Sequence, residues 1–293
     1  MIKKRLLSVF LLTAFILAAF AQNACANVKK ARILMLATGG TIAGVANGNS
    51  AIGYDAGKIS GQDIVDSVPG IENIADIDVE QIANIASQDM DYATLKKLTD
   101  RINRAFDDDK YDGVVITHGT DTMEETAFFL DLTVANEKPV VLTGSMRPAT
   151  SISPDGPKNL YDAMIVASAP SAYGRGVVIA LNGCVWDARH AMKSNTNSVE
   201  TFSSTFGGPI GIVDAEGVVF FSPRPGSKVY FPLKDEKLPR VDIIYMHTAM
   251  EADVVDDCLA HGAKGIVLAG VGEGNTNAET LKRLRDAGFQ AWL

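Results

Sequence analysis

Continuous apolar runs of strand length alternate along this chain with segments whose apolar residues recur at helical spacing. The runs ARILMLA at 31–37 and VVIT at 114–117 show no apolar–polar alternation, which is typical of strands buried on both faces of a parallel sheet. The segment 91–107 places its apolar residues on one stripe, which predicts an amphipathic helix. The same two patterns recur and predict strands at 76–85, 139–143 and 176–181 and helices at 123–136 and 158–167.

This alternation predicts the fold class and the division into domains. Alternating strands and helices favour an α/β fold with a doubly wound, mostly parallel sheet in a large N-terminal domain. Proline, glycine and charged residues then mark a linker, and a second series predicts a smaller α/β domain. Its strands are expected at 241–245 and 266–268, and its helices at 253–260 and 278–287. The expected boundaries are a signal peptide at 1–26, an N-terminal domain at 27–218, a linker at 219–240 and a C-terminal domain at 241–293.

The N-terminus has the pattern of an export signal. Three cationic residues at 3–5 precede an apolar run at 6–21, and A-x-A cleavage sites end at Ala21 and Ala26. A membrane anchor is the alternative, but the run is shorter than the ~20 residues that a spanning helix needs. We therefore expect an exported, soluble chain that is periplasmic or secreted and has no membrane contact after cleavage.

Charge and cysteine content narrow the class of partner. The formal net charge is −8, and loss of the three cationic residues of the signal lowers it to −11. An acidic chain without a basic stripe disfavours nucleic acid and suits a small or neutral ligand. Only Cys184 and Cys258 remain after cleavage at Ala26. A disulfide framework is therefore excluded, while pairing of these two cysteines stays open.

Polar, glycine-rich turns follow several of the predicted strands. They are TGGTIAG at 38–44, ASQDM at 86–90 and HGTD at 118–121. In open α/β sheets, ligands bind outside the carboxyl ends of the strands. Backbone amides at a helix start can hold a carboxylate or an oxyanion. These turns are therefore the candidate ligand-binding corners of the fold.

Plainer interpretations compete for these turns. The threonines and the aspartate before Glu124 also fit helix-capping chemistry, with no ligand involved. A phosphate cradle is the alternative for the turn 38–44. That turn has neither the Lys-Ser/Thr ending of a P-loop nor the G-x-G-x-x-G spacing, which disfavours nucleotide binding.

Two isolated side chains and the histidines add little by themselves. Tyr54 in the glycine-rich loop 45–58 and Lys193 in the polar loop 187–197 both fit ordinary surface residues. The four histidines do not recur at ligand spacing, and no H-E-x-x-H motif is present. We therefore expect neither a metal nor another cofactor.

Five segments, taken together, resemble one enzyme family. They are TGGTIAG at 38–44, ASQDM at 86–90, HGTDTMEETAFFLDLT at 118–133, GSMRPATSISPDGP at 144–157 and AGVGEGN at 269–275. In this order, and over essentially the whole mature chain, the sequence is similar to bacterial type II L-asparaginases and the related periplasmic glutaminase-asparaginases. The resemblance implies hydrolysis of the side-chain amide of L-asparagine, with L-glutamine as a second candidate substrate. It also implies a homotetramer in which paired subunits share sites.

The resemblance implies roles for individual residues. Thr41 would be the nucleophile that forms an acyl-enzyme, activated by Tyr54, although which threonine attacks first stays open. Thr120, Asp121 and Lys193 would form a second set, in which the lysine helps to activate a threonine hydroxyl or the attacking water. The substrate-binding residues that the resemblance implies are Gly40, Ser87, Gln88, Gly119, Thr120, Asp121, Ser145 and Asn275.

The chain also departs from the family. It ends at 289–293, where relatives continue with a third strand of the second domain, so we expect a truncated domain and an unstable or weakly active protein. Glu273 stands where many relatives carry a neutral or small residue, which weakens the assignment of Asn275. Two other classes compete: a periplasmic amino-acid-binding protein without catalysis, and an inactive remnant. Hydroxyls at three strand ends together with Lys193 exceed what binding requires, which favours the enzyme.

Overall fold

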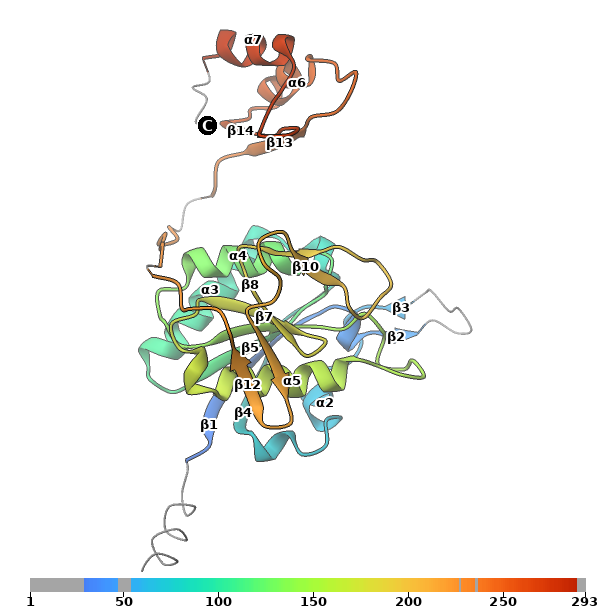
Figure 1. The fold of residues 1–293 in the computed structure, drawn as a ribbon, viewed down its shortest axis with the longest axis vertical. Helices are drawn as coiled ribbons and strands as arrows, with labels where there is room; N and C mark the ends of the chain where they lie inside the picture. The colour runs from blue at the N-terminus through green and yellow to red at the C-terminus, as the bar shows by residue number, and fades with distance from the viewer. Residues whose placement is uncertain (1–28, 47–53, 227, 235–236, 289–293) are drawn as a thin grey trace, which may run out of the picture. The chain divides into compact units, whose positions relative to one another are not determined.

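The computed structural model of the 293-residue chain describes residues 29–46, 54–226, 228–234 and 237–288. The expected signal peptide at 1–26 and the middle of the loop 45–58 lie outside these residues. The chain forms two compact units, divided between Leu233 and Lys234 (Figure 1). None of the helices in the described ranges has the length and apolar character needed to cross a membrane.

The first unit is built on an eight-stranded sheet with the strand order β12-β11-β8-β7-β6-β5-β1-β4. The parallel strands are β4 (Ala75–Ile85), β1 (Ala31–Gly39), β5 (Gly113–Thr117), β6 (Val140–Thr143) and β7 (Val177–Leu181). The antiparallel strands are β8 (Cys184–Asp187), β11 (Gly211–Asp214) and β12 (Gly217–Phe220). The predicted α/β class with a large, mostly parallel sheet is confirmed. Because β12 runs to Phe220, the sheet extends into the range 219–240 that the sequence predicts as a linker.

The strands after β7 are too short to show an apolar period, and the sequence patterns do not predict them. β7 and β8 are joined by Asn182-Gly183, whose φ angles are 54° and 73°. Asn-Gly is the preferred pair for a two-residue hairpin because both residues tolerate positive φ. The expected loop 187–197 is also wrong in part. It contains β9 (Ala191–Lys193), which pairs with β10 (Phe202–Ser204).

Helices cover both faces of the parallel strands. Ile33 and Met35 of β1 are buried in one cluster with α2 and α5, whereas Leu34 and Leu36 are buried in the other with α3 and α4. Full burial of each such side chain contributes roughly 1.5–3 kcal/mol, so both faces of the sheet hold the fold together. The doubly wound arrangement is therefore confirmed. The helices are α2 (Gly61–Asp66), α3 (Tyr92–Asp107), α4 (Met123–Thr133) and α5 (Gly156–Ser168).

The strand order reverses between β1 and β5. From β1 the chain crosses to β4 on one side and then to β5 on the other, after which β6 and β7 follow outward. At such a switch point, the loops after the two strands separate and leave a crevice outside the carboxyl ends. The turns 38–44 and 118–121 lie at the ends of β1 and β5. The fold therefore places two of the candidate corners at this crevice.

The second unit is a small α/β fold with the predicted strand–helix series. Its core gathers Ile244, Val255 and Leu284 on one face of the sheet. Alternate residues on the opposite face are exposed, with Ile243 at 65% and Tyr245 at 77%. Its elements are β13 (Val241–Tyr245), α6 (Val254–Ala260), β14 (Gly265–Ala269) and α7 (Ala278–Asp286). Cys258 in α6 and Cys184 in β8 belong to different units, and both are free thiols.

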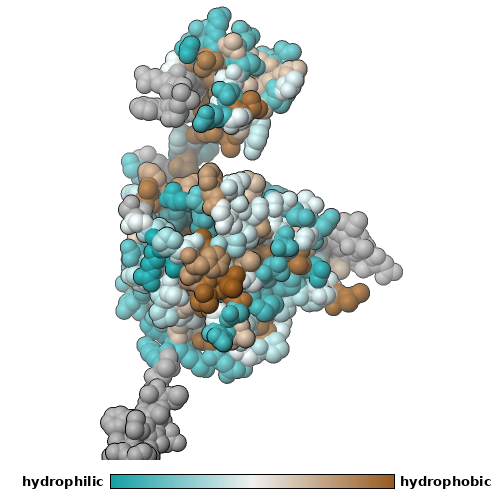
Figure 2. Space-filling model, in the orientation of Figure 1, coloured by the Kyte–Doolittle hydropathy of each residue, from teal (hydrophilic) through white to brown (hydrophobic). Residues whose placement is uncertain are grey.

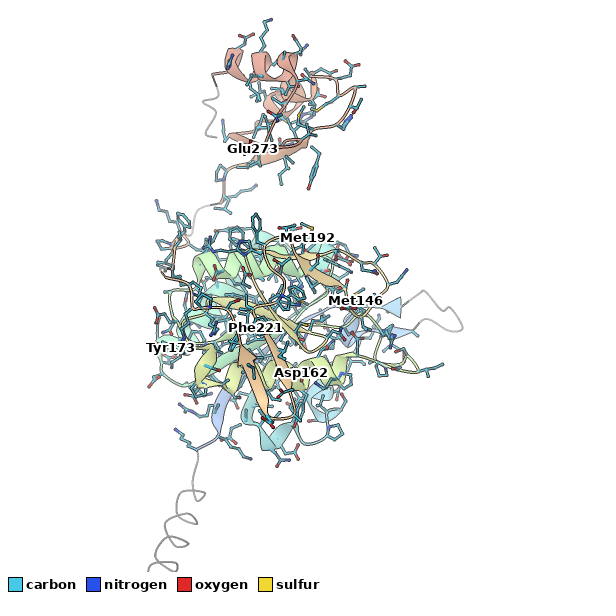
Figure 3. The ribbon with its side chains drawn as sticks, viewed as in Figure 1. Met146, Asp162, Tyr173, Met192, Phe221 and Glu273 are labelled. Atoms are coloured by element: carbon cyan, nitrogen blue, oxygen red, sulfur yellow. The ribbon has the colours of Figure 1, made fainter. Side chains whose placement is uncertain are left out.

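An apolar patch is exposed on the first unit around the end of β12. Figure 2 shows it in brown, at the place where Figure 3 labels Phe221. The exposed fractions are 59% for Phe221, 51% for Val219 and 40% for Ile212. Because β12 is an edge strand of the sheet, an apolar patch here is typical of an interaction surface.

Candidate active site

The turn after β1 is tied to the end of β5 and packs tightly. The hydroxyl of Thr38 donates to the carbonyl of Thr117 at 2.8 Å. Gly39 and Gly40 then adopt φ angles of 110° and 78°, which favour glycine. They lead into the short 3-10 helix η1 (Thr41–Ala43), and Thr41 is buried with 5% of its surface exposed. The turn thus holds a threonine at the carboxyl end of the first strand.

The turns after β1 and β5 are in backbone contact. A Cβ atom built on Gly40 would lie 2.4 Å from the amide nitrogen of Gly119 and 2.8 Å from the carbonyl carbon of His118. Only a residue without a side chain allows this approach. Thr41 and Thr120 each follow one of the two touching glycines. The fold therefore brings the two threonine-bearing corners to the same end of the sheet.

The capping interpretation of the turn after β5 is wrong. Thr122 is the N-cap residue of α4, yet its side chain makes no capping hydrogen bond with that helix. The Thr122 hydroxyl instead donates to the carbonyl of Ser87 at 2.7 Å. Glu124 bonds to another segment of the chain altogether. These polar side chains therefore connect three segments of the chain instead of capping the helix.

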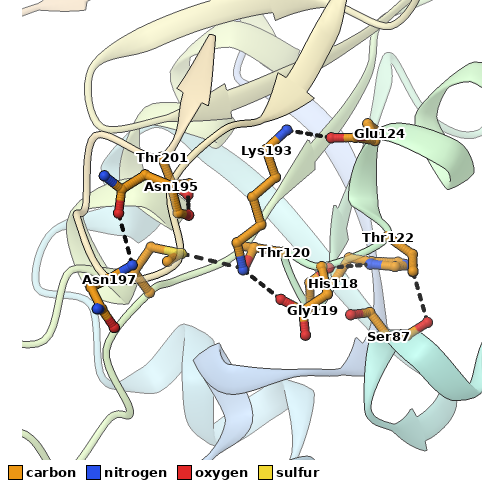
Figure 4. A network of polar contacts seen from close by, with 12 residues as sticks. Ser87, His118, Gly119, Thr120, Thr122, Glu124, Lys193, Asn195, Asn197 and Thr201 are labelled. Carbon is orange, nitrogen blue, oxygen red and sulfur yellow. Dashed lines mark hydrogen bonds and ion pairs between the residues drawn. The ribbon is translucent and has the colours of Figure 1, made fainter. Parts of the chain in front are cut away.

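Lys193 reaches the turn after β5 from the hairpin β9–β10 (Figure 4). Its Nζ donates to Thr120 Oγ1 at 2.9 Å and to Asp121 Oδ1 at 2.5 Å. The side chain of Lys193 is 14% exposed, whereas that of Asp121 is 59% exposed. Thr120 is nearly buried, and its hydroxyl donates to Met146 Sδ at 3.3 Å. A cation, a hydroxyl and a carboxylate are thus in direct contact.

Glu124 holds the backbone of Lys193 in place, a role that the sequence patterns do not reveal. Its Oε2 accepts a hydrogen bond from the Lys193 backbone N–H (Figure 4). Glu124 belongs to the first turn of α4, close to Thr120 and Asp121 in the chain. One helix start therefore positions both the backbone of Lys193 and the residues that its side chain contacts. The only signal in the sequence is Glu124 itself, which fits capping equally well.

His118 is a buried side chain that contacts the turn after β5. It is fully buried, with Nδ1 2.7 Å from the carbonyl of Gly119 and Nε2 3.0 Å from Thr126 Oγ1. Because a carbonyl can only accept, Nδ1 carries the proton and Nε2 accepts from the threonine hydroxyl. Burial lowers the pKa of His118, so the neutral ring is favoured.

Ser87 and Ser145 complete the surroundings of Thr120. Ser87 begins the short helix η3 (Ser87–Asp89), and a Cβ on Gly119 would lie 2.8 Å from its hydroxyl. Ser145 is fully buried, and its hydroxyl donates to the carbonyl of Arg147 at 2.8 Å. Gln88 follows Ser87 and is exposed. These residues come from the ends of β4 and β6, the strands next to β1 and β5.

Two candidate residues are not brought to this cluster by any described contact. Tyr54 lies in β3 (Tyr54–Asp55), where its backbone pairs with Ala46 of β2 (Val45–Ala46). The side chain of Tyr54 lies outside the part of the chain that the structure describes. Asn275 belongs to the second unit, is exposed and forms a backbone bridge with Val271. Within the described ranges, no three His, Cys, Asp or Glu side chains are grouped so that they could hold a metal ion.

The chemistry of the cluster follows from its contacts. The Lys193 ammonium donates to the Thr120 hydroxyl, so it would stabilise negative charge on the hydroxyl oxygen. It would also stabilise negative charge on an atom that takes the place of the hydroxyl proton. The second oxygen of Asp121 lies at an exposed position and can accept from a cationic ligand group. Threonine hydroxyls are weak nucleophiles that need such a neighbour to react. The arrangement suits acyl transfer to a hydroxyl from a small molecule that carries an ammonium group.

Comparison with known proteins identifies the family. The family model described as Asparaginase, N-terminal matches residues 32–225, and the model described as Glutaminase/Asparaginase C-terminal domain matches residues 240–291. The "Probable L-asparaginase periplasmic" of Haemophilus influenzae is 47% identical over 259 residues, covering 87% of this chain and 74% of the relative. The "L-asparaginase 2" of Escherichia coli is 45% identical over 249 residues, covering 83% of this chain and 70% of the relative.

A solved structure agrees with this result. The "Probable Cytoplasmic L-asparaginase from Campylobacter jejuni" has a TM-score of 0.83 and 40% sequence identity, and the match covers 88% of this chain and 80% of that chain. The two family models span both units of the described structure. The resemblance seen in the five sequence segments is thus confirmed, and the chain belongs to the asparaginase family.

Proposed function

We propose that the protein hydrolyses the side-chain amide of L-asparagine to L-aspartate and ammonia. The observation that carries this proposal is the contact of Lys193 with both Thr120 and Asp121, at 2.9 and 2.5 Å, at the switch point of the sheet. A binding protein needs charges to hold an amino acid, but it does not need a buried hydroxyl held against an ammonium. The names of the relatives, which are L-asparaginases, support the same reaction.

The proposed first step is attack by Thr41. Its hydroxyl oxygen forms a bond to the carboxamide carbon, and the carbon–nitrogen bond then breaks, so that the acyl group is carried as an ester. The hydroxyl proton ends on the leaving nitrogen, which departs as ammonia. Tyr54 is the proposed proton carrier for this threonine. The close approach of Gly40 to Gly119 supports this step, because it brings the turn that carries Thr41 against the turn that carries Thr120.

The proposed second step releases the product. A water molecule adds to the ester carbon, the bond to Thr41 breaks, and the threonine regains its proton as L-aspartate leaves. Thr120, Lys193 and Asp121 are the proposed set that orients this water and stabilises the charge that develops. The nearly buried hydroxyl of Thr120 and the 14% exposure of Lys193 support it, because electrostatic stabilisation is stronger where water is excluded.

The same corner would recognise the free amino acid. Asp121 is the proposed partner of the α-ammonium group, since one of its oxygens binds Lys193 and the side chain is 59% exposed. Ser87 and Gln88 are proposed to hold the α-carboxylate by neutral hydrogen bonds, and Ser145 to line the amide end. Asn275 is proposed to contact substrate in the site of a neighbouring subunit. L-Glutamine, one methylene longer, is a second candidate substrate, and rates measured on both amides decide the preference.

We also propose that the protein acts outside the cytoplasm and as a homo-oligomer. The cationic start and A-x-A sites at 1–26 support export, as does the relative named periplasmic; the solved neighbour is named cytoplasmic. The exposed apolar patch at Phe221 supports an assembly. Fractionation of producing cells and light scattering test these two proposals.

Ammonia release from L-asparagine tests the reaction. Thr41→Ala and Thr120→Ala are each expected to lower it by roughly 100-fold or more, because each removes a group that takes part in the chemistry. Thr205→Ala, at an exposed threonine outside the cluster, is the matched control and is expected to leave the rate unchanged. An unaltered protein that binds L-asparagine but releases no ammonia would instead be an amino-acid-binding protein.

A further inference from the structure

A cavity lies in the first unit, at the end of the sheet opposite the candidate active site. Its volume is about 400 Å³, which is in the range of small-molecule sites. Gly176 and Val177 at the start of β7, and Asp187 at the end of the antiparallel β8, form part of its wall. The segment from Ser222 to Gly226, together with Lys228, closes the other side. The cavity shares no residue with the cluster around Thr120.

Two arginines, Arg175 and Arg224, line this cavity. Arg175 donates from Nε to the carbonyl of Ser171 at 2.9 Å and from Nη1 to the carbonyl of Ser222 at 3.0 Å. Arg224 makes a long contact of 3.5 Å with the carbonyl of Pro170. Within the described residues, neither arginine forms an ion pair with a carboxylate. Burial and the neighbouring charge of Arg224 both lower the pKa of Arg175, so the two positive charges oppose each other.

Lys228 adds a third cation to the same wall. Its Nζ donates to the carbonyl of Asn136 at 3.0 Å, and burial lowers the pKa of this amine. The nearby carboxylates Asp131 and Glu137 act in the other direction and favour the charged amine. Neither carboxylate is within ion-pair distance of Lys228 in the described structure. Lys228 is therefore half-buried, and its ammonium group donates to one backbone carbonyl.

Most of the acidic side chains of the cavity are already engaged. Asp131 accepts from the backbone N–H of Val177 at 3.1 Å and lies 3.4 Å from Arg189. Asp187 lies 2.8 Å from Nδ1 of His190. Glu137 is the remaining carboxylate, and its charge favours the charged form of Lys228. With Arg189 counted, the lining carries four cationic side chains against three carboxylates, a surplus of one positive charge in a protein whose formal net charge is −8.

We propose that this cavity binds a small doubly charged anion, such as a phosphate ester or a dicarboxylate. Arg175 lies over the ring of Phe220, 3.8 Å from its centroid, so its planar fork is held in one orientation before a ligand arrives. Within the described residues its Nη2 has no hydrogen-bond partner, so it can donate to an anion. Ile210 and Phe206 supply apolar wall, which favours a ligand with a short carbon body.

Calorimetric titration of the full chain at constant ionic strength tests the proposal. Glycerol 3-phosphate and succinate are the two probes, used separately, and saturable binding of at least one is expected. Arg224→Gln is expected to weaken that binding by roughly 10-fold or more, because it removes a charged donor. Arg224 is exposed, so its replacement spares the fold, and Arg175→Gln provides a second variant. Arg104→Gln, at an exposed arginine of α3, is the matched control and should bind as the unaltered protein does.

The two probes also separate the two sources of the anion. Tighter binding of glycerol 3-phosphate assigns the cavity to phosphate esters, and tighter binding of succinate assigns it to dicarboxylates. Saturable binding of neither probe would overturn the proposal. So would binding that Arg224→Gln and Arg175→Gln leave unchanged, because the anion would then be bound elsewhere.

Discussion

Lys193 Nζ lies 2.9 Å from Thr120 Oγ1, although the two residues are 73 positions apart in the chain. The hairpin β9–β10 carries the lysine, and the turn between β5 and α4 carries the threonine. The same ammonium binds Asp121, so one cation connects a buried hydroxyl to an exposed carboxylate. The proposed chemistry depends on this connection, and four predictions follow from it and its supports.

Replacing Lys193 by methionine keeps the length of the side chain and removes its charge. We expect Lys193→Met to lower kcat for L-asparagine by roughly 100-fold or more, because the charge that develops during turnover loses its stabilising partner. Measured ammonia release gives the rate, and circular dichroism shows that the variant is folded. Lys97→Met, at an exposed lysine of α3, should keep the full rate. Equal rates for both variants would remove Lys193 from the mechanism.

Glu124 is expected to act on the reaction only through Lys193. Glu124→Ala removes the acceptor of the Lys193 backbone N–H, so we expect kcat to fall by roughly 10-fold with a smaller change in KM. Glu124→Gln retains an oxygen acceptor and should recover most of the rate. Glu125→Ala, on the exposed side of the same turn, is the control. If glutamine and alanine at position 124 behaved alike, the hydrogen bond would have no positioning role.

Because the turns after β1 and β5 are in backbone contact, we expect a single methyl group added at Gly40 to destabilise the protein strongly. In Gly40→Ala, the added Cβ would lie 2.4 Å from the Gly119 amide nitrogen, at a φ of 78°. Because the neighbouring atoms are backbone, we expect the free energy of unfolding to fall by about 2–4 kcal/mol. Urea denaturation measures it. Gly226→Ala, where a Cβ meets nothing within 4 Å, should be near neutral, and a Gly40→Ala variant of equal stability would contradict the described contact.

His118 predicts a pH-dependent contribution to stability. Burial lowers its pKa below the ordinary value of 6.5, so below that pH the unfolded chain takes up a proton that the folded chain does not. The free energy of unfolding should therefore fall as the pH drops, by up to about 1.4 kcal/mol at one pH unit below 6.5. His118→Gln should remove this part of the slope between pH 7.5 and 5.5, as measured by chemical denaturation. The exposed His261→Gln is the control, and an unchanged slope in His118→Gln would refute the assignment.

The sequence predicts the parallel half of the fold well, because buried strands such as 31–37 leave long apolar runs. It does not predict β9, since three residues are too few to show a period. The Asn182-Gly183 hairpin was within reach of sequence reasoning, because Asn-Gly is a strong turn signal. The pairing of the strands that follow the hairpin is apparent only in the three-dimensional structure.

The residues of the candidate site also differ in how far the sequence predicts their positions. The corners 38–44 and 118–121 follow predicted strands, so their position at the carboxyl edge can be derived from the fold class. Lys193 and Glu124 act through contacts between distant segments. No local pattern contains such contacts, and each residue has an ordinary surface or capping interpretation. The family resemblance, and not the spacing of residues, indicates a role for Lys193. The role of Glu124 is apparent only in the three-dimensional structure.

The central claim is that Thr41 carries the acyl group during turnover. Acid quenching of the protein during reaction with L-asparagine, followed by proteolysis and mass spectrometry, locates any ester on the chain. The Lys193→Met variant should accumulate more of it, because release of the product by water is slowed. The account predicts an aspartyl ester on Thr41. An ester on Thr120 instead, or turnover without any ester in either protein, would contradict it.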